Sequence, residues 1–403
     1  MTFPTLVIPD TLAAGPGPGN TDPRVLERLY LTGVADHMQK DVIRGMMEAK
    51  AMLREVFGTK NVHTFGVAGT GFSGLDCILS MIHPGDNVVV FVNGTFSGID
   101  GLTIRMKAST EEELASDSLN PKPANVKIVE VPHGQSVTGE IIEKALAEHK
   151  PMWAFIAHWE TGSGRINDIQ AFNDACQKHG VMGMVDAVSS LGIEYFDIDD
   201  YPAVVAWSSC PQKGILCLPL TYAPVSFRDE AIEVVKKRGC RTYSHHPVLE
   251  ARHWGIINGK DGDPAYHRTH SCYSVAAFHE ALRILLQHGR EQKAVDYAYH
   301  EKALRLAVEA MGCEVSSNMT SLVVLNLPGK LAGLEKDYLA QLKNIQDKSD
   351  HRKQKNEKVK EGNILIDKRL LKKNIVRTCP VCFIYSFSSR DALYINKFSC
   401  CRE

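Results

Sequence analysis

The sequence lacks any long apolar run. No window of eighteen residues is both apolar and free of charge, and a helix needs about that length to cross a bilayer. The first ten residues, MTFPTLVIPD, also lack the basic segment and the long apolar segment of a secretion signal. These absences predict a soluble, cytoplasmic protein, and leave the peroxisome and the mitochondrion open as destinations.

A strong net charge is also absent. The formal net charge is -1 over 403 residues, although residues 341–403 carry 15 Lys and Arg against 7 Asp and Glu. The most charged run, DKSDHRKQKNEKVKEG, mixes both signs and lacks the interleaved aromatic side chains typical of nucleic-acid binding. We therefore expect no nucleic-acid partner and no membrane partner, and a basic tail that is partly disordered because it has few apolar residues.

Paired cysteines are scarce as well. Most of the eleven cysteines stand alone in apolar or helical surroundings, which is typical of reduced, buried thiols. Cys379 and Cys382 form one spaced pair, but Cys400 and Cys401 are adjacent, which is an awkward second half for a tetrahedral zinc site. The sequence predicts no metal site.

The composition that remains is globular, with 44% hydrophobic and 23% charged residues, enough for about two domains. Short apolar runs alternate with helical patterns, which predicts an α/β fold with a mainly parallel sheet covered by helices. The expected strands of this sheet are residues 63–67, 87–92, 126–131, 153–158, 181–185 and 203–207. The chain then divides into an N-terminal arm (1–21), a large domain (22–283), the start of a smaller α+β C-terminal domain (284–340) and a divergent basic tail (341–403).

Two of the expected strands lead to reactive side chains. The run 181–185 ends in Asp186, and the run 203–207 opens into a turn that contains Lys213. Ligands of open α/β sheets bind beyond the carboxyl ends of the strands, so both side chains can reach one small molecule. Lysine and aspartate suit pyridoxal phosphate, because the amine forms a Schiff base with the aldehyde and the carboxylate pairs with the ring nitrogen. This spacing alone is not specific, because many α/β proteins share it.

A glycine-rich turn, GTGFSG, follows the first expected strand and satisfies the dinucleotide pattern GxGxxG. A dinucleotide site also needs an acid at the end of the next strand, and Asn93 stands there instead. The turn still offers free backbone N–H groups and the Thr70 hydroxyl at the start of a helix, which suits one phosphate group. A tight turn without any ligand is an equal alternative.

Three other turns hold side chains that could either bind a ligand or serve only the fold. Phe96 can stack on a flat ligand or be an ordinary core aromatic. Thr161 can bond a ring oxygen or belong to a turn before a helix cap. Tyr266 and Thr269, at the start of a helical pattern, offer two hydroxyls that could hold a phosphate.

Seven motifs in order, GPGPGN, AGTG, NGTF, HWETGSG, VDAVSSLG, PQKG and YHRT, resemble those of the class V aminotransferases of pyridoxal phosphate fold type I. They are most similar to the alanine–glyoxylate and serine–pyruvate aminotransferase group. The resemblance covers about residues 13–327. It implies pyridoxal 5'-phosphate, a homodimer, and transfer of an amino group from a small amino acid (alanine or serine) to a small 2-oxo acid (glyoxylate or pyruvate).

The resemblance also implies a role for each matching residue. It makes Lys213 the Schiff-base lysine, which also moves the substrate proton, and Asp186 the partner of the ring nitrogen. The other implied residues are Thr70, Gly71 and Gln212 at the phosphate, Phe96 above the ring, Val188 beneath it, Thr161 at the ring oxygen, Tyr266 and Thr269 at the phosphate of the other subunit, and Pro18 and Gly19 in the substrate pocket.

The chain departs from the family pattern in its last part and near the pocket. Trp159 stands where the family usually has a small residue, which predicts a reshaped pocket, and the C-terminal arginine that clamps the substrate carboxylate has no counterpart in its usual motif. Two alternatives follow: another fold type I reaction of the lyase or desulfurase type, or a cofactor-binding protein with impaired turnover. A desulfurase needs a mobile catalytic cysteine, and Cys210 and Cys240 stand in no loop of that sort.

Overall fold

The computed structural model describes Gly17, residues 19–30, Gly33 and residues 36–218, 221–310 and 314–324, together with the backbone of 325–326, 382–386 and 392–397. Its centre is a seven-stranded sheet with the order β1-β9-β8-β7-β4-β2-β3. The bounds are β1 His63–Gly69, β2 Val88–Val92, β3 Val126–Glu130, β4 Trp153–Ala157, β7 Met182–Asp186, β8 Val204–Ser208 and β9 Thr221–Phe227. Only β9 runs in the opposite direction to the other six strands of this sheet, so the prediction of a mainly parallel sheet is confirmed.

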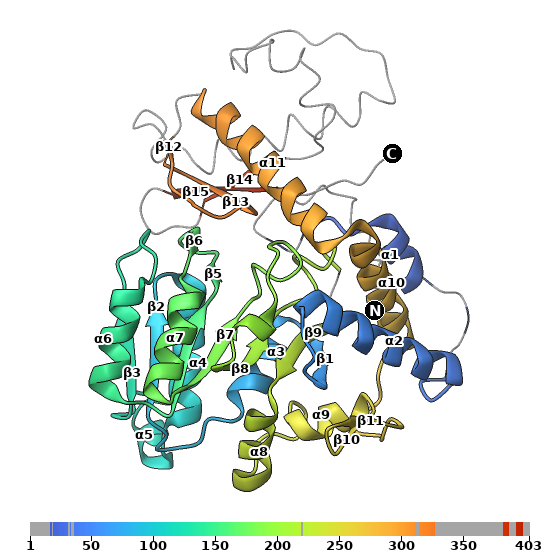
Figure 1. Cartoon of the computed structure of the whole chain (residues 1–403), viewed down its shortest axis with the longest axis horizontal. Helices are drawn as coiled ribbons and strands as arrows, with labels where there is room; N and C mark the ends of the chain where they lie inside the picture. The colour runs from blue at the N-terminus through green and yellow to red at the C-terminus, as the bar shows by residue number, and fades with distance from the viewer. Residues whose placement is uncertain are drawn as a thin grey trace, which may run out of the picture.

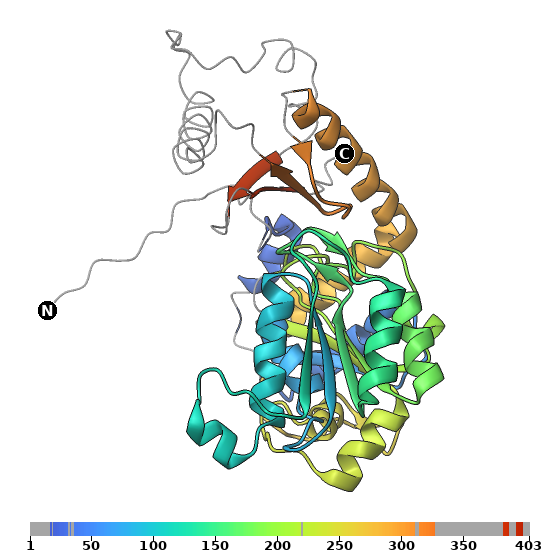
Figure 2. The ribbon, with the colours of Figure 1, turned by 90° about the vertical axis from the view of Figure 1, so that its left-hand side faces the viewer.

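Helices cover both faces of the sheet, with α4 on one side and α6 and α7 on the other (Figure 1 and Figure 2). The bounds are α1 Pro23–Leu29, α2 Lys40–Phe57, α3 Gly71–Leu79, α4 Thr95–Ala108, α5 Glu111–Ser116, α6 Gly139–His149, α7 Ile169–His179, α8 Asp229–Arg238 and α9 Pro247–His253. The longest of these, α2, buries Met46, Leu53 and Phe57 and stops at Gly58, whose φ of 61° favours glycine. This layering buries the apolar strands on both faces, as parallel strands require.

The strand β9 was missed by the sequence patterns. Its sequence, TYAPVSF, contains Pro224, and a proline argues against a central strand because it has no N–H for the ladder. In the sheet, Pro224 lies opposite Gly66 of β1, and its carbonyl accepts a hydrogen bond from the Ser209 N–H (2.9 Å). Pro224 therefore still pairs with the β8 side through its carbonyl oxygen, although it has no N–H group to donate.

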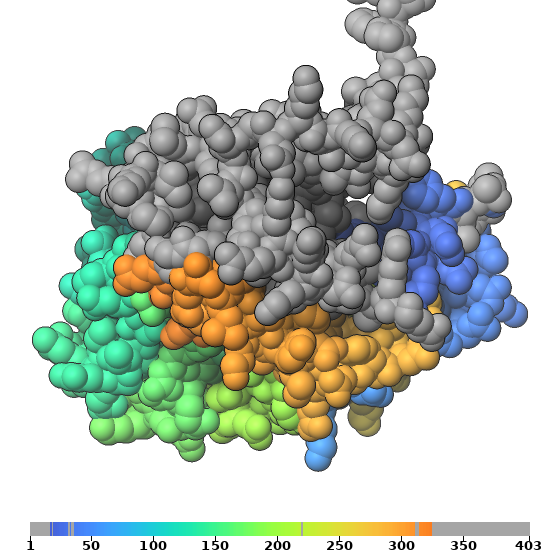
Figure 3. Space-filling view, turned by 90° about the horizontal axis from the view of Figure 1, so that it is seen from above, coloured from blue at the N-terminus to red at the C-terminus, as the bar shows by residue number. Residues whose placement is uncertain are grey.

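A smaller unit lies above the large sheet (Figure 2). It follows the helices α10 (Cys272–His288) and α11 (Arg290–Glu309), and its strands are β12 (Glu314–Val315), β13 (Leu322–Asn326), β14 (Cys382–Ser386) and β15 (Ala392–Lys397) in the order β12-β13-β15-β14. Because β13 pairs with β15, part of the predicted basic tail shares a sheet with the small domain. Viewed from above, the orange surface of α11 lies between the teal edge of the large domain and the blue N-terminal helices (Figure 3).

The domain boundary predicted at residue 283 falls inside α10. Buried side chains of this helix, through Leu285, belong to the core of the large domain. The helix ends at Gly289, whose φ of 94° separates it from α11. We therefore propose Gly289 as the start of the small domain.

A second apolar cluster joins the two units. Trp159, in the two-residue strand β5 (Trp159–Glu160), is only 2% exposed and packs with Tyr297 of α11 and Leu322 and Val324 of β13. Its indole is thus buried between the domains, where it fixes the small domain against the end of β4. None of the described helices is both long enough and apolar enough to cross a membrane, and the cytoplasmic location stays a prediction.

Candidate functional site

Asp186 and Lys213 lie beyond the carboxyl ends of two neighbouring parallel strands, as predicted. Asp186 is the last residue of β7 and pairs in register with Ser208, the last residue of β8. Lys213 follows in the turn after β8. The Asp186 carboxylate is buried, and its Oδ1 accepts the backbone N–H of Val188 at 2.7 Å. The sheet therefore fixes the carboxylate, while the turn presents the amine.

Burial acts on both groups in the direction that favours their neutral forms. It raises the pKa of Asp186, to which the nearby Glu160 carboxylate adds, while the Val188 N–H and the Lys213 amine oppose the rise. Burial lowers the pKa of Lys213, and the negative groups around it, including Asp186, offset only part of that effect. An amine with a lowered pKa is a better nucleophile near neutral pH. A buried carboxylate with a raised pKa gains most from a cation placed beside it.

The cradle predicted for a phosphate lies at the start of α3. Thr70 is the N-cap of this helix, and its hydroxyl accepts the Phe72 N–H at 3.2 Å. A Cβ at Gly71 would lie 3.0 Å from both Val188 Cγ2 and Cys210 Cβ, so a larger residue here would require these side chains to shift. The Gln212 Oε1 atom is buried and has no hydrogen-bond partner among the described residues. The helix start thus meets the turns that carry Val188 and Gln212.

Asn93 takes no part in a ribose site. The amide nitrogen of this buried side chain donates to Gln135 O and to Asn167 Oδ1, both at 2.9 Å, and its amide oxygen accepts from Asn167. These bonds join the end of β2 to the turn after β6 (Arg165–Ile166). Both polar atoms of the Asn93 side chain are engaged in these structural hydrogen bonds, so the fold does not support a dinucleotide site.

Phe96 and Thr161 close the site from α4 and from the turn after β5. The Phe96 ring is half-buried, and the Lys213 Nζ atom lies 5.7 Å from its centroid, so the ring faces the amine. Thr161 is buried, and its hydroxyl bonds the Ser189 hydroxyl two residues past the start of the 187–190 turn. Both side chains are therefore directed to the same strand ends as Asp186.

The sequence patterns missed two buried acids at this site. Glu160 is completely buried and accepts the N–H groups of Phe96 (2.7 Å) and Ser163 (2.5 Å). Asp100 of α4 is also buried, its Oδ2 has no hydrogen-bond partner among the described residues, and burial raises its pKa with Asp186 and Glu160 adding to the effect. Neither acid stands directly after one of the strands that the sequence pattern predicted, so neither was singled out. The one available signal was the position of Glu160 directly after the mostly apolar run WAFIAHW, where a charged side chain is expected to be buried.

Two residues of the predicted N-terminal arm, Gly17 and Thr21, lie beside the turn that holds Lys213. The Thr21 hydroxyl donates to the Cys217 carbonyl at 2.7 Å, and a Cβ at Gly17 would come within 3.3 Å of Lys213 Cγ. Gly19 lies between these two contacts, and its predicted partner in the pocket, Pro18, lies outside the described residues. Three arginines of the tail, Arg369, Arg377 and Arg390, are the sequence's candidates to replace the missing carboxylate clamp, and they also lie outside the described residues.

Tyr266 and Thr269 are placed differently from the other predicted residues. The two hydroxyls are 3.2 Å apart, and Tyr266 is 65% exposed, with its ring 6.1 Å from that of His37. The described contacts link neither residue to Lys213 or to the cradle of α3. Within one chain they form a hydroxyl pair at the surface.

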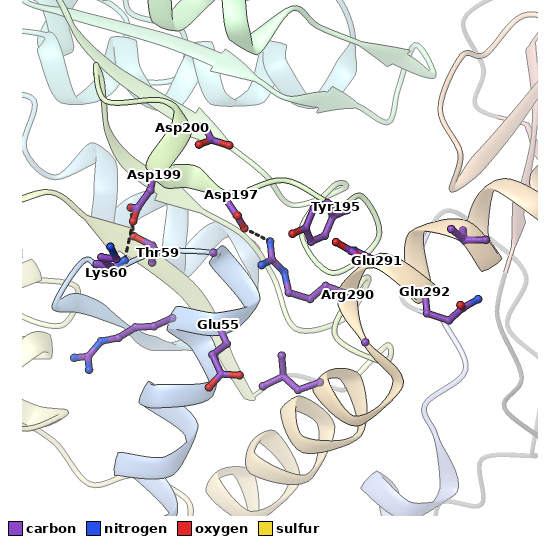
Figure 4. Close-up of a pocket in the computed structure, with 15 residues that line it drawn as sticks. Glu55, Thr59, Lys60, Tyr195, Asp197, Asp199, Asp200, Arg290, Glu291 and Gln292 are labelled. Atoms are coloured by element: carbon purple, nitrogen blue, oxygen red, sulfur yellow. Dashed lines mark hydrogen bonds and ion pairs between the residues drawn. The ribbon is translucent and has the colours of Figure 1, made fainter.

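A pocket of about 930 Å³ lies elsewhere, near the beginnings of β1 and β8 (Figure 4). Arg290 pairs with Asp197 at 2.7 Å, and Asp199 accepts from the Thr59 hydroxyl at 2.6 Å and from the Lys60 N–H at 3.0 Å. These bonds tie the start of α11 and the end of α2 to one turn. None of the residues predicted for the site lines this pocket, which is at the opposite ends of the strands.

The residues around Lys213 fit pyridoxal phosphate. The start of α3 at Thr70 and Gly71 offers backbone N–H groups to a phosphate, the Gln212 amide has its Oε1 buried without a partner among the described residues, and the buried Asp186 carboxylate is the group that a protonated ring nitrogen would satisfy. Residues 30–216 match the family Aminotransferase class-V. The chain is similar to the class V aminotransferases over this stretch. It is accordingly a pyridoxal phosphate-dependent transaminase, and its sheet is that of fold type I.

Two relatives support the transaminase assignment, and one solved structure supports the fold. The transaminase is 29% identical to the alanine–glyoxylate aminotransferase of Oryctolagus cuniculus over 291 residues, which cover 71% of this chain and 69% of that protein. It is 26% identical over 337 residues to the (S)-ureidoglycine–glyoxylate transaminase of Bacillus subtilis, covering 79% and 77%. The structure of an alanine–glyoxylate aminotransferase from Nostoc sp. superposes with a TM-score of 0.76 at 23% identity, covering 98% and 92%, and supports the fold.

Proposed function

We propose that this transaminase moves an amino group from alanine or serine to glyoxylate or pyruvate, with Lys213 as its catalytic lysine. The observation that carries the proposal is the approach of Lys213, Asp186, Phe96 and the α3 cradle at one edge of the sheet. The relatives include alanine–glyoxylate and ureidoglycine–glyoxylate aminotransferases, which supports a small 2-oxo acid as the acceptor.

In this proposal each side chain has a separate task. The Lys213 amine, whose pKa is lowered by burial, attaches the cofactor and later carries the proton that leaves and returns at the substrate α-carbon. Asp186 keeps the ring nitrogen protonated. Phe96 and Val188 would hold the ring between them, Thr161 would bond its oxygen, and Thr70, Gly71 and Gln212 would bind the phosphate. When bound, pyridoxal phosphate supplies an electron sink for the bond that breaks at the α-carbon.

The proposal is tested by incubating the cofactor-loaded protein with alanine and glyoxylate and measuring pyruvate and glycine. Serine with pyruvate is the second pair, and the Lys213→Ala variant is the control. We expect turnover with at least one pair, and a high KM for the amino acid, because no arginine stands in the family's carboxylate motif. Bound cofactor without any amino transfer would instead favour the lyase-type or impaired-turnover alternative.

The exposed Tyr266 and Thr269 lead to a prediction about assembly. In one chain no described contact joins these hydroxyls to the cradle, so we propose that they complete the phosphate site of a second copy in a homodimer. Dilution to monomer should then weaken cofactor retention, and Tyr266→Phe should weaken it about tenfold by removing one hydrogen bond to a charged group.

The measurement is cofactor release followed by absorbance, beside the mass from light scattering at the same concentrations. Tyr243 is a matched control, because it is similarly exposed and lies next to His267, but it has no predicted contact with the phosphate. A monomer that retains the cofactor tightly would contradict the shared site.

A further inference from the structure

Glu160 joins two turns that approach Lys213 from different parts of the chain. One carboxylate oxygen accepts the N–H groups of Phe96 (2.7 Å) and Ser97 (3.3 Å), at the start of α4. The other accepts the Ser163 N–H at 2.5 Å, in the turn that follows Thr161. The side chain is 0% exposed, so these hydrogen bonds form away from competing water.

The fold reserves space for this carboxylate. A Cβ at Gly94 would come within 1.9 Å of Glu160 Oε2, and the three nearest atoms to that Cβ all belong to the Glu160 carboxyl group. Gly94 has a φ of -176°, which any residue adopts, so the glycine is needed for space and not for its backbone conformation. The Glu160 carboxylate therefore links the NGTF turn to the HWETGSG turn, and Gly94 leaves the room that it needs.

We propose that Glu160 is a positioning residue, which holds Phe96 and Thr161 at a fixed separation on the two sides of the Lys213 amine. This inference rests on the proposed function, since it concerns the same cofactor site. The described hydrogen bonds of the carboxylate run to the backbone of the two turns. Glu160 acts by fixing the N-terminus of α4, from which the Phe96 ring extends toward Lys213, and the turn from which Thr161 reaches Ser189.

The carboxylate has a second effect through its charge. Glu160 is among the negative groups that raise the pKa of Lys213 against the larger effect of burial, and it raises the pKa of Asp186 in addition to burial. Removing the charge but keeping the shape should therefore lower the pH at which the Lys213 nitrogen loses its proton. A buried acid that only stabilises the fold would leave that pH unchanged.

Two variants distinguish the effect of the Glu160 side-chain length from the effect of its charge. Glu160→Gln keeps the length, but its amide can present only one acceptor oxygen, so an NH2 group would face the N–H of Phe96 or Ser163. We expect its cofactor affinity to fall roughly ten- to hundredfold, as for a buried donor left without a partner, and the midpoint of the pH titration of bound-cofactor absorbance to move down. Glu160→Asp keeps the charge and is one methylene shorter, so affinity should fall while the midpoint stays near that of the wild type.

Asp86→Asn is the matched control. Asp86 is also buried and accepts from a backbone N–H (His83, 2.9 Å) and from Arg238 (2.7 Å), but it precedes β2 at the other end of the strands. Its replacement should lower stability without moving the pH midpoint or the cofactor affinity. If Glu160→Gln behaves like Asp86→Asn, Glu160 is only structural and the proposal is overturned.

Gly94→Ala provides a test that does not depend on the folding of Glu160→Gln. The added methyl group displaces the carboxylate, so cofactor affinity should fall in the single variant, and much less when Gly94→Ala is added to Glu160→Ala, where no carboxylate remains to be displaced. Additive losses would contradict the proposed contact. If the wild-type protein itself binds no pyridoxal phosphate, the proposed function fails, an outcome distinct from failure of the Glu160 assignment.

Discussion

Replacing Lys213 by alanine is expected to abolish covalent cofactor attachment and to lower amino transfer by about 10²- to 10⁴-fold or more, the range attributed to one positioned acid–base group. Borohydride treatment should fix pyridoxal phosphate to the wild-type chain and not to the variant, because Lys213 is the amine that faces Phe96 beside the α3 cradle. Mass spectrometry of the treated protein measures this directly. Methylamine added to the variant should restore part of the turnover by replacing the missing base.

Lys50 provides the control for this experiment. It is another buried lysine, and its Nζ donates to the Trp254 carbonyl at 2.9 Å and pairs with Asp261 at 2.9 Å. Lys50→Ala should lower the free energy of unfolding while borohydride still fixes the cofactor. Borohydride labelling that survives in Lys213→Ala would show that the lysine is wrongly assigned.

Replacing Asp186 by asparagine is expected to lower turnover by about 10²- to 10³-fold, the cost typical of removing one preorganised electrostatic partner. A neutral amide does not hold the ring nitrogen protonated, so the bound cofactor accepts electrons less well. The fold should remain, because asparagine has almost the same shape and its side-chain oxygen still accepts the Val188 N–H. Turnover close to that of the wild type would exclude the proposed role.

The same variant should be more stable than the wild type when the cofactor is absent. The pKa of Asp186 is raised in the folded chain above its unfolded value of about 3.9, so the folded state binds the proton more tightly. Wild-type stability is therefore lost as the pH rises from that unfolded value toward the folded one, and the advantage of asparagine grows over this window. A tenfold difference in proton affinity corresponds to about 1.4 kcal/mol. Cofactor should reverse the order, because it binds the wild type more tightly.

Asp86→Asn should change the free energy of unfolding in the opposite direction to Asp186→Asn. Burial opposes ionisation of Asp86, but hydrogen bonds from Arg238, His83 and Trp153 more than offset it and lower the pKa. Its stabilising effect is present above the unfolded pKa and is lost as the pH falls through the folded one, so this variant should be less stable than the wild type near neutral pH. Thermal unfolding at about pH 5 and pH 8, with and without cofactor, measures both variants.

Local patterns in the sequence were enough to find most of the parallel strands and the strand ends that carry the candidate site residues. Apolar runs such as 181–185 and 203–207 specify buried strands by themselves, and the sheet then brings Asp186 and the turn of Lys213 to one edge because parallel strands end on the same side. The helix that begins after Thr70 was predicted for the same reason, since its cap is a local feature. The clearest failure was β9, where Pro224 hides a central strand whose partners lie far away in the chain.

The sequence by itself therefore determined the α/β sheet and the candidate lysine, aspartate and phosphate turn, because each depends on residues close together in the chain. Only the tertiary structure decided which distant groups meet. Glu160 binds N–H groups of the α4 turn more than sixty residues away, Thr161 meets Ser189, and Trp159 packs against the small domain. No periodicity encodes such contacts, because they depend on how strands and turns separated by whole elements approach one another, and that approach is fixed by packing of the entire core.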